Sequence, residues 1–302
     1  MKWIKKGLIF CPDGSLHWAK THAMVPVPEL LTPDILRIYL TFCDDKGIGR
    51  LGYIDVSAND VSQVISISNE PLLDIGAPGT FDENGALTCS VVTLPDKTKM
   101  AYYAGFELGH RIRYRLLTGV ALSSGGKFQR LRQVPILERS DKELYFRGGP
   151  FVVYEGDYFK MWYVAGSGWI DIDGKPMPVY TINYIESKDG INWPPEGKIC
   201  IDIGSEEEHG FGRPYVIHEN GIYKMFYSIR IKHKGYRIGY AESSDGVLWS
   251  RKDDEAGIDV SGSGWDSETV CYAAVITVKG TAYMFYNGND FGRTGVGYAV
   301  LG

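Results

Sequence analysis

The sequence predicts an all-β fold, a five-bladed β-propeller with four-stranded antiparallel blades. The 302 residues include 37 Gly, 14 Pro, 20 Tyr, 12 Phe and 7 Trp scattered throughout, a composition typical of short strands joined by tight turns. The sequence also repeats itself: the octet ESKDGINW at 186–193 recurs 56 residues later as ESSDGVLW at 242–249. Such a repeat indicates stacked structural units of one kind.

Five units follow when the strand before each octet, or before its weaker copies, is aligned. The aligned positions are Tyr53, Val120, Tyr184, Tyr240 and Tyr298. Each follows an aromatic-rich strand, with a further strand before that. With the strand after the Asp-Gly turn, each unit becomes a four-stranded sheet that must stack on its neighbours around an axis to bury both faces. We expect residues 1–302 to form one such domain.

The two chain ends indicate how the ring closes. The last unit stops at Gly302 without a fourth strand, while residues 3–10 form a spare apolar strand ahead of the first unit. We expect the N-terminal strand to complete the last blade, because this pairing removes two exposed sheet edges. The octets themselves are expected to be structural, with Asp-Gly supplying the turn and Trp covering the sheet.

Charge and cysteine content limit the partners. The chain has 37 Asp and Glu against 32 Lys and Arg, which argues against a nucleic-acid partner because phosphate contacts require clustered basic residues. No apolar run approaches the roughly 20 residues of a membrane span, so no membrane partner is expected. The five cysteines are an odd number and include no CxxC pair, which predicts reduced thiols and a cytoplasmic location. The six histidines show no ligand spacing, so no metal or cofactor is expected. The oligomeric state is left open.

Several motifs resemble those of the five-bladed propeller superfamily of glycoside hydrolases. They are Phe-Asp-x-x-Gly at 81–85, Asp-Gly-Ile-x-Trp at 189–193, Gly-Trp-Asp-Ser-Glu at 264–268, Tyr-Asn-Gly-Asn at 286–289 and the Arg-Pro pair at 213–214. The superfamily includes arabinanases, xylosidases, invertases, levansucrases and β-mannoside phosphorylases. The pattern, spread over nearly the whole chain, is most similar to members associated with bacterial surface-polysaccharide synthesis.

The resemblance implies a carbohydrate-active enzyme, glycosidase-like or glycoside phosphorylase-like. Such an enzyme would act on a glycosidic or sugar-phosphate bond in surface-glycan metabolism. Its partner would be a small-molecule sugar, a sugar phosphate or a nucleotide sugar. The alternative is a non-catalytic propeller that binds a glycan or a nucleotide sugar.

Two carboxylates are the catalytic candidates. In a propeller the innermost strands line the central channel, so residues at their starts converge at one end of it. Glycosyl transfer requires a proton donor and a second carboxylate across the channel, and Asp82 and Glu268 each precede an expected inner strand. Glu207 or Glu208 is an alternative for either position. Taken singly, Asp82 is equally well explained as part of a turn and Asp266 as part of a loop, and the three-Glu run at 206–208 is better explained as a solvated loop.

Further polar and aromatic residues at the channel mouth are candidates for substrate binding. Arg147 and Arg213 suggest a bound anion, because a guanidinium matches phosphate or carboxylate with two hydrogen bonds; structural ion pairs are the alternative. Trp169 is the candidate for stacking on a sugar ring, within a segment at 166–179 that could cover the channel mouth as a lid. The remaining candidates are His22, Asp266, Tyr272 and Asn287.

One departure from the family pattern favours the binding alternative. Arabinanase-type enzymes present a catalytic Asp on the inner strand of the first blade, whereas the matching segment at 21–26 reads THAMVP. His22 can act as a base or hydrogen-bond to a sugar hydroxyl, but it cannot be equated with that Asp.

Overall fold

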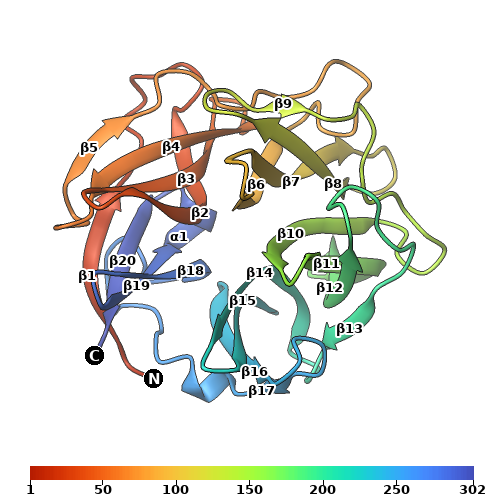
Figure 1. The fold of residues 1–302 in the computed structure, drawn as a ribbon. Coiled ribbons are helices and arrows are strands. Elements are labelled where there is room, and N and C mark those ends of the chain that lie inside the picture. Colours follow the sequence, from red (N-terminus) through yellow and green to blue (C-terminus); the bar gives the residue numbers. More distant parts are fainter.

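The fold is all-β, with sheets arranged around a central axis (Figure 1). The computed structural model describes residues 1–302 apart from the side chain of Ser167. Its strands group into four hydrogen-bonded sheets. The helical segments are a short 3₁₀ turn, η1 (Asp253–Glu255), and α1 (Asn289–Gly292). No helix among the described residues has the length and apolar character that a membrane crossing requires.

Three of the sheets have four strands. The first contains β2 (Thr21–Thr32), β3 (Ile35–Cys43), β4 (Gly49–Ser57) and β5 (Val64–Ile67). The second contains β14 (Glu208–Glu219), β15 (Ile222–Ile231), β16 (Arg237–Ser243) and β17 (Ser250–Arg251). The third contains β18 (Cys271–Val278), β19 (Thr281–Asn287), β20 (Val296–Leu301) and β1 (Trp3–Phe10).

The fourth sheet has eight strands in two halves. One half contains β6 (Ala86–Thr93), β7 (Lys99–Leu108), β8 (Tyr114–Ser123) and β9 (Gln129–Arg130). The other contains β10 (Phe146–Glu155), β11 (Tyr158–Ile172), β12 (Lys175–Ser187) and β13 (Lys198–Ile201). A short parallel pairing of β10 with β8 joins them, at Phe146 with Leu116 and Arg147 with Leu117.

The N-terminal strand lies where the sequence places it. β1 pairs antiparallel with β20, from Trp3 opposite Leu301 to Phe10 opposite Val296. The two chain ends therefore lie together on one sheet (Figure 1). The Trp3 side chain is buried and packs edge-on against Phe226 of the adjacent sheet, with ring centroids 6.2 Å apart.

The repeated octets form turns that tie neighbouring groups of strands together. In the second octet the Asp245 carboxylate accepts hydrogen bonds from the backbone N–H groups of Val247 and Leu248, and Gly246 adopts a φ of 77° that favours glycine. The indole of Trp162, on β11, donates to the carbonyl oxygen of Gly246 over 2.8 Å. The structural interpretation of the octets is therefore consistent with the contacts they make.

Candidate functional site

The first strands of the four-stranded groups surround one axis. They contact one another in the order β2, β6, β10, β14, β18 and back to β2. Each has an irregular pairing, or bulge, where it faces the axis. Bulges re-aim side chains away from the alternation of a regular strand. In the bulges lie Val25, Cys89, Gly149, Arg213 and Tyr272, which all line a cavity of about 130 Å³, the axial cavity.

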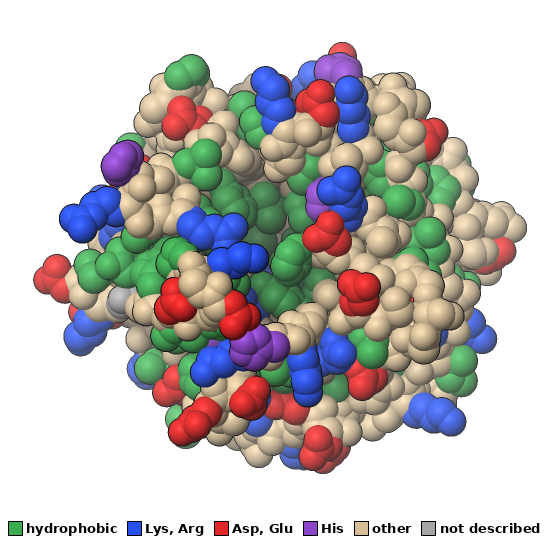
Figure 2. All heavy atoms as spheres, turned by 180° about the vertical axis from the view of Figure 1, so that it is seen from behind, with side chains coloured by type: hydrophobic (Ala, Val, Ile, Leu, Met, Phe, Trp, Pro, Cys, Tyr) green, Lys and Arg blue, Asp and Glu red, His purple; other side chains and the backbone are tan. Residues whose placement is uncertain are grey.

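Aromatic side chains complete the walls of the axial cavity. They are Phe106, Tyr114, Tyr180, Phe211 and Tyr236, together with Tyr272 from its bulge. Burial raises the pKa of Tyr180 and Tyr272 well above its ordinary value, so both hydroxyls stay protonated. Among the described residues that line this cavity there is no Asp or Glu. Figure 2 shows a hollow at the centre of one face, with hydrophobic side chains inside it and Lys and Arg side chains around it.

Backbone strain accompanies two of the bulges. Val25 has a φ of 55° and Tyr272 a φ of 55°, a conformation that is unfavourable for a β-branched residue and uncommon for tyrosine. Hydrogen bonds hold both: Val25 N–H donates to Asn287 Oδ1 over 2.8 Å, and Tyr272 N–H donates to Ser228 Oγ over 2.9 Å. Asn287 is thus a buried positioning residue for the axial cavity.

Arg213 lines the axial cavity, but its hydrogen-bonding groups are occupied by the protein. Its guanidinium donates to the backbone carbonyl oxygens of Pro26, Cys89, Tyr272 and Ala273 over 2.9–3.5 Å. Burial lowers its pKa to about 10. These contacts connect β14 with β2, β6 and β18, so Arg213 acts on the structure as a link between inner strands.

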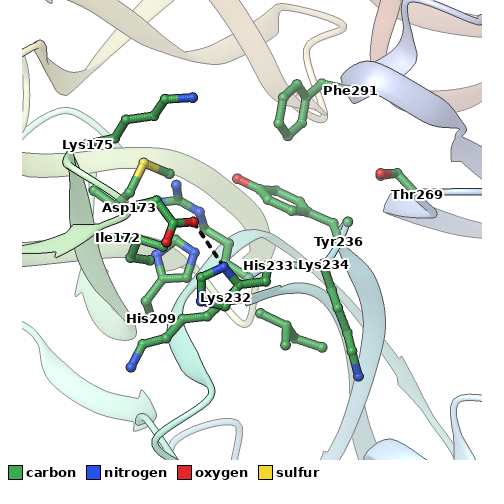
Figure 3. Close-up of a pocket in the computed structure, with 14 residues that line it drawn as sticks. Ile172, Asp173, Lys175, His209, Lys232, His233, Lys234, Tyr236, Thr269 and Phe291 are labelled. Atoms are coloured by element: carbon green, nitrogen blue, oxygen red, sulfur yellow. Dashed lines mark ion pairs between the residues drawn. The ribbon is translucent and has the colours of Figure 1, made fainter.

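A second pocket, the cationic pocket, adjoins the axial cavity and shares Tyr236 with it. Its volume is about 320 Å³. Its charged or ionisable lining residues are Asp173, Lys175, His209, Arg230, Lys232, His233, Lys234 and Tyr236. Figure 3 shows His209, Lys175 and Ile172 on one side of it and Tyr236, Thr269 and Phe291 on the other. The segment at 166–179, expected as a lid, continues β11 and β12 as a hairpin whose tip forms a wall of this pocket.

Asp82 is buried away from the axial cavity. Its Oδ2 accepts from Arg130 Nε over 2.6 Å and its Oδ1 from Thr80 Oγ1 over 3.0 Å. The Arg130 guanidinium also lies over the ring of Tyr103, 5.9 Å from its centroid. Asp82 is therefore part of a buried ion pair beside the second strand of its sheet.

The same arrangement of tyrosine, carboxylate and cation occurs in three other groups of strands. Glu143 bridges the Tyr163 hydroxyl, 2.9 Å away, and Arg147 Nε, 2.5 Å away. Asp266 bridges Tyr286 and Lys5, at 3.0 and 2.7 Å. The third set is Tyr227, Asp253 and Arg251. Arg147 and Asp266, candidates for substrate binding, thus have structural partners instead of lining the axial cavity.

The remaining candidates lie on or near the surface. Glu268 is exposed, and it directly precedes Thr269, which lines the cationic pocket. His22 is half-buried with its Nδ1 3.0 Å from Thr21 Oγ1, and burial lowers its pKa. Trp169 packs against Phe146, with ring centroids 5.5 Å apart, and lines a separate side cleft of about 460 Å³. Of the sequence-based candidates, Arg213 and Tyr272 meet in the axial cavity.

The sequence reasoning missed Arg230, which lies beside His209 in the cationic pocket. His209 lies in β14 and Arg230 in β15, and both line the cationic pocket. A signal was available, because four of the five residues at 230–234, RIKHK, are basic in a chain with a net charge of −5.

Comparison with known proteins identifies relatives of the whole chain. Uncharacterized protein Rv1502 of Mycobacterium tuberculosis H37Rv is 35% identical over 302 residues, covering 100% of this chain and 99% of that protein. Uncharacterized protein MT1551 of strain CDC 1551 is 34% identical over the same length. The chain belongs to the family of these mycobacterial proteins. No protein-family model matches it.

Solved structures with a similar fold include glycoside hydrolases. One described as a glycoside hydrolase has a TM-score of 0.74 at 18% identity, covering 98% of this chain and 90% of that chain. An α-L-arabinofuranosidase from Lactobacillus brevis has a TM-score of 0.70 at 10% identity, covering 93% and 90%. A putative glycosidase from Bacteroides thetaiotaomicron has a TM-score of 0.69 at 16% identity, covering 99% and 96%. The chain therefore has a glycoside hydrolase-like all-β fold.

Proposed function

We propose that this chain is a carbohydrate-binding protein that takes a sugar unit of a surface glycan, or its activated precursor, at the axial cavity and its mouth. The observation that carries the proposal is the lining of the axial cavity: hydroxyl-bearing aromatic side chains from several strands, and no Asp or Glu of the described residues. Apolar walls with a few convergent polar groups are typical of small-molecule sites. The axial cavity alone is small, but the adjoining cationic pocket enlarges the space.

The proposal includes a five-bladed propeller. The eight-stranded sheet counts as two blades, because only two residue pairs join its halves. With β1 completing the last sheet, each blade then has four strands. The contacts that run from β2 through β18 and back to β2 support this count.

Binding without hydrolysis is favoured by the environment of the buried carboxylates. Glycoside hydrolysis needs two carboxyl groups on either side of the scissile bond, roughly 5–9.5 Å apart. Asp82, Glu143 and Asp266 are each neutralised by a cation within the protein. None of these three carboxylates lines the axial cavity or the cationic pocket, so none is placed to reach a sugar bound there.

A glycoside hydrolase or phosphorylase acting through Asp82 and Glu268 is the second candidate. One observation favours it: the exposed Glu268 lies next to Thr269, at the edge of the cationic pocket. In this proposal Glu268 would be the acid or base that touches the sugar.

Thermal-shift screening with mono- and oligosaccharides, sugar phosphates and nucleotide sugars, followed by product analysis of every hit, tests both candidates. We expect a saccharide to raise the melting temperature without forming a product. Tyr236→Phe should weaken this binding severalfold, whereas Tyr158→Phe, at an exposed position, should not. Product formation that is lost in Glu268→Gln would instead establish the second candidate. If no saccharide, sugar phosphate or nucleotide sugar binds or reacts, both candidates are wrong.

A further inference from the structure

We propose that Arg230, with Lys232 and His209, forms a binding site for an oxyanion, so that the sugar taken by this protein carries a phosphate or carboxylate group. The inference rests on the proposed function for the sugar, and it adds the chemical class of the ligand. The oxyanion would lie in the cationic pocket, and the sugar ring would lie toward the axial cavity.

Arg230 is a buried cation without a carboxylate partner. Arg230 as a residue is 4% exposed, and no ion pair among the described residues includes it. Its Nη1 donates to the carbonyl oxygen of Pro178 over 3.4 Å, and its guanidinium also interacts with the Tyr236 hydroxyl. Among the described residues its Nε has no hydrogen-bond partner. Burying a charged group is costly unless it is paired and hydrogen-bonded. A bound oxyanion would supply both the charge and the acceptors.

Two other arginines near the inner strands, Arg147 and Arg213, are buried as well, and their partners can be compared with those of Arg230. Arg147 pairs with Glu143 and also donates to the Glu138 carbonyl oxygen over 2.7 Å. Arg213 makes five hydrogen bonds to backbone carbonyl oxygens. The Nε of Arg147, like that of Arg230, makes no hydrogen bond with the described residues, but Arg147 has a carboxylate partner and Arg213 has four carbonyl acceptors. Among the described residues Arg230 has no carboxylate partner and a single carbonyl acceptor.

The residues around Arg230 also carry an excess of positive charge. Lys175, Lys232, His233 and Lys234 line the cationic pocket with it, and Asp173 is the acidic residue among the described lining residues. Asp173 Oδ2 lies 3.1 Å from His233 Nδ1 (Figure 3), so it is directed to that imidazole. A pocket with clustered cations in a chain of net charge −5 concentrates anions locally.

Aromatic rings fix the guanidinium in place and connect it to the axial cavity. Arg230 lies over the rings of Tyr180 and Tyr236, 4.7 and 5.7 Å from their centroids. Both tyrosines also line the axial cavity. Rigid stacking limits the side-chain entropy lost on binding. An oxyanion on Arg230 and a sugar beside Tyr236 would thus belong to one ligand.

His209 supplies a group whose protonation reports on the site. Its Nδ1 lies 3.3 Å from the carbonyl oxygen of Pro178, which leaves Nε2 for another partner. Burial lowers its pKa to about 4, and the charges of Arg230 and Lys232 act in the same direction. An oxyanion in the pocket would oppose those charges and raise the pKa of His209.

Titration with inorganic phosphate tests the oxyanion site without any sugar. At fixed ionic strength, we expect phosphate to raise the melting temperature and to shift the His209 ring signals in NMR spectra toward the protonated form. Arg230→Gln should reduce the affinity at least tenfold and remain folded, because it removes an uncompensated buried charge. Arg132→Gln, which removes an exposed charge elsewhere, should bind phosphate as the parent does. Equal phosphate affinity in Arg230→Gln would overturn the proposal.

Phosphate affinity is also measured for Lys232→Gln, with Lys188→Gln as a control at an exposed position. We expect Lys232→Gln to weaken phosphate binding several-fold and Lys188→Gln to leave it unchanged. If neither differs from the parent protein, the pocket is not the site and the proposal is wrong.

Glucose 1-phosphate, glucuronate and glucose distinguish the ligand classes. Tighter binding of glucose 1-phosphate or of glucuronate than of glucose, lost in Arg230→Gln, supports the proposal and identifies the group as phosphate or carboxylate. Saccharide binding that is insensitive to Arg230 overturns the oxyanion site while leaving the proposed function standing. Phosphate binding without any saccharide binding supports the oxyanion site and contradicts the proposed function.

Discussion

The guanidinium of Arg213 donates two hydrogen bonds to the backbone carbonyl oxygen of Cys89, from Nε over 3.3 Å and from Nη2 over 3.0 Å. Arg213 belongs to β14 and Cys89 to β6, strands that lie 124 residues apart in sequence at these positions. Three further carbonyl oxygens, on β2 and β18, bind the same side chain. A side chain at the axis thus replaces backbone pairing that the bulges interrupt.

Arg213→Lys should therefore destabilise the fold. Lysine has one ammonium in place of three nitrogen donors, so most of the four carbonyl oxygens would lose their partner in a buried site. Hydrogen bonds to charged groups are each worth about 1.5–3 kcal/mol, and we expect the free energy of unfolding to fall by about 3 kcal/mol or more. Urea denaturation measures it. Arg132→Lys, at an exposed position, should stay within about 0.5 kcal/mol of the parent.

Asp82→Asn tests whether the ion pair with Arg130 is structural. Removing one member of a buried ion pair leaves an uncompensated charge and costs about 3–5 kcal/mol. Asp82 is 0% exposed, so we expect a loss of that size in chemical denaturation. Glu207→Gln, a neutral amide replacing an exposed carboxylate, should change stability little. A stable Asp82→Asn variant that had lost a measured turnover would assign Asp82 to catalysis instead.

The closure of the fold by β1 predicts unequal effects at two neighbouring positions. Trp3 is 6% exposed and packs on Phe226, whereas Ile4 is 44% exposed. Trp3→Ala should lower the free energy of unfolding by about 3–5 kcal/mol, because it removes a buried aromatic side chain. Ile4→Ala should cost less than about 1 kcal/mol. Similar values for both would mean that β1 does not hold the last sheet in solution.

Local sequence patterns predicted the turns and strands well, because their causes are local. The Asp245–Gly246 turn needs only a carboxylate that accepts nearby N–H groups and a glycine at positive φ. The pairing of β1 with β20 followed from a strand without a partner at each chain end. In both cases the residues that determine the structure can be recognised in the sequence without knowing the positions of other strands.

The composition of the axial cavity could not be predicted in the same way. The sequence analysis named Arg213 and Tyr272, but other side chains reach the cavity from bulges a few residues after the strand starts, as Val25 and Cys89 do. A bulge depends on pairing with another strand and leaves no local pattern. Likewise, the partner of Asp82 is Arg130, 48 residues away, and nothing near Asp82 indicates an ion pair.

His209 predicts how stability depends on pH. Its pKa in the folded protein is lowered from 6.5 to about 4, first by burial and then by the charges of Arg230 and Lys232; the Pro178 carbonyl oxygen opposes the shift in part. Between these two pH values the unfolded chain binds a proton at this position that the folded chain does not. The free energy of unfolding therefore falls as pH decreases from about 6.5 to about 4, and His209→Gln should flatten that part of the curve. His17→Gln, at an exposed position, should keep the slope of the parent.

Because phosphate on Arg230 would raise the pKa of His209, saturating phosphate should also flatten the stability curve of the parent protein. The slope of the curve for His209→Gln should not change when phosphate is added. A slope that is equal in the parent and in His209→Gln, with and without phosphate, would contradict this coupling.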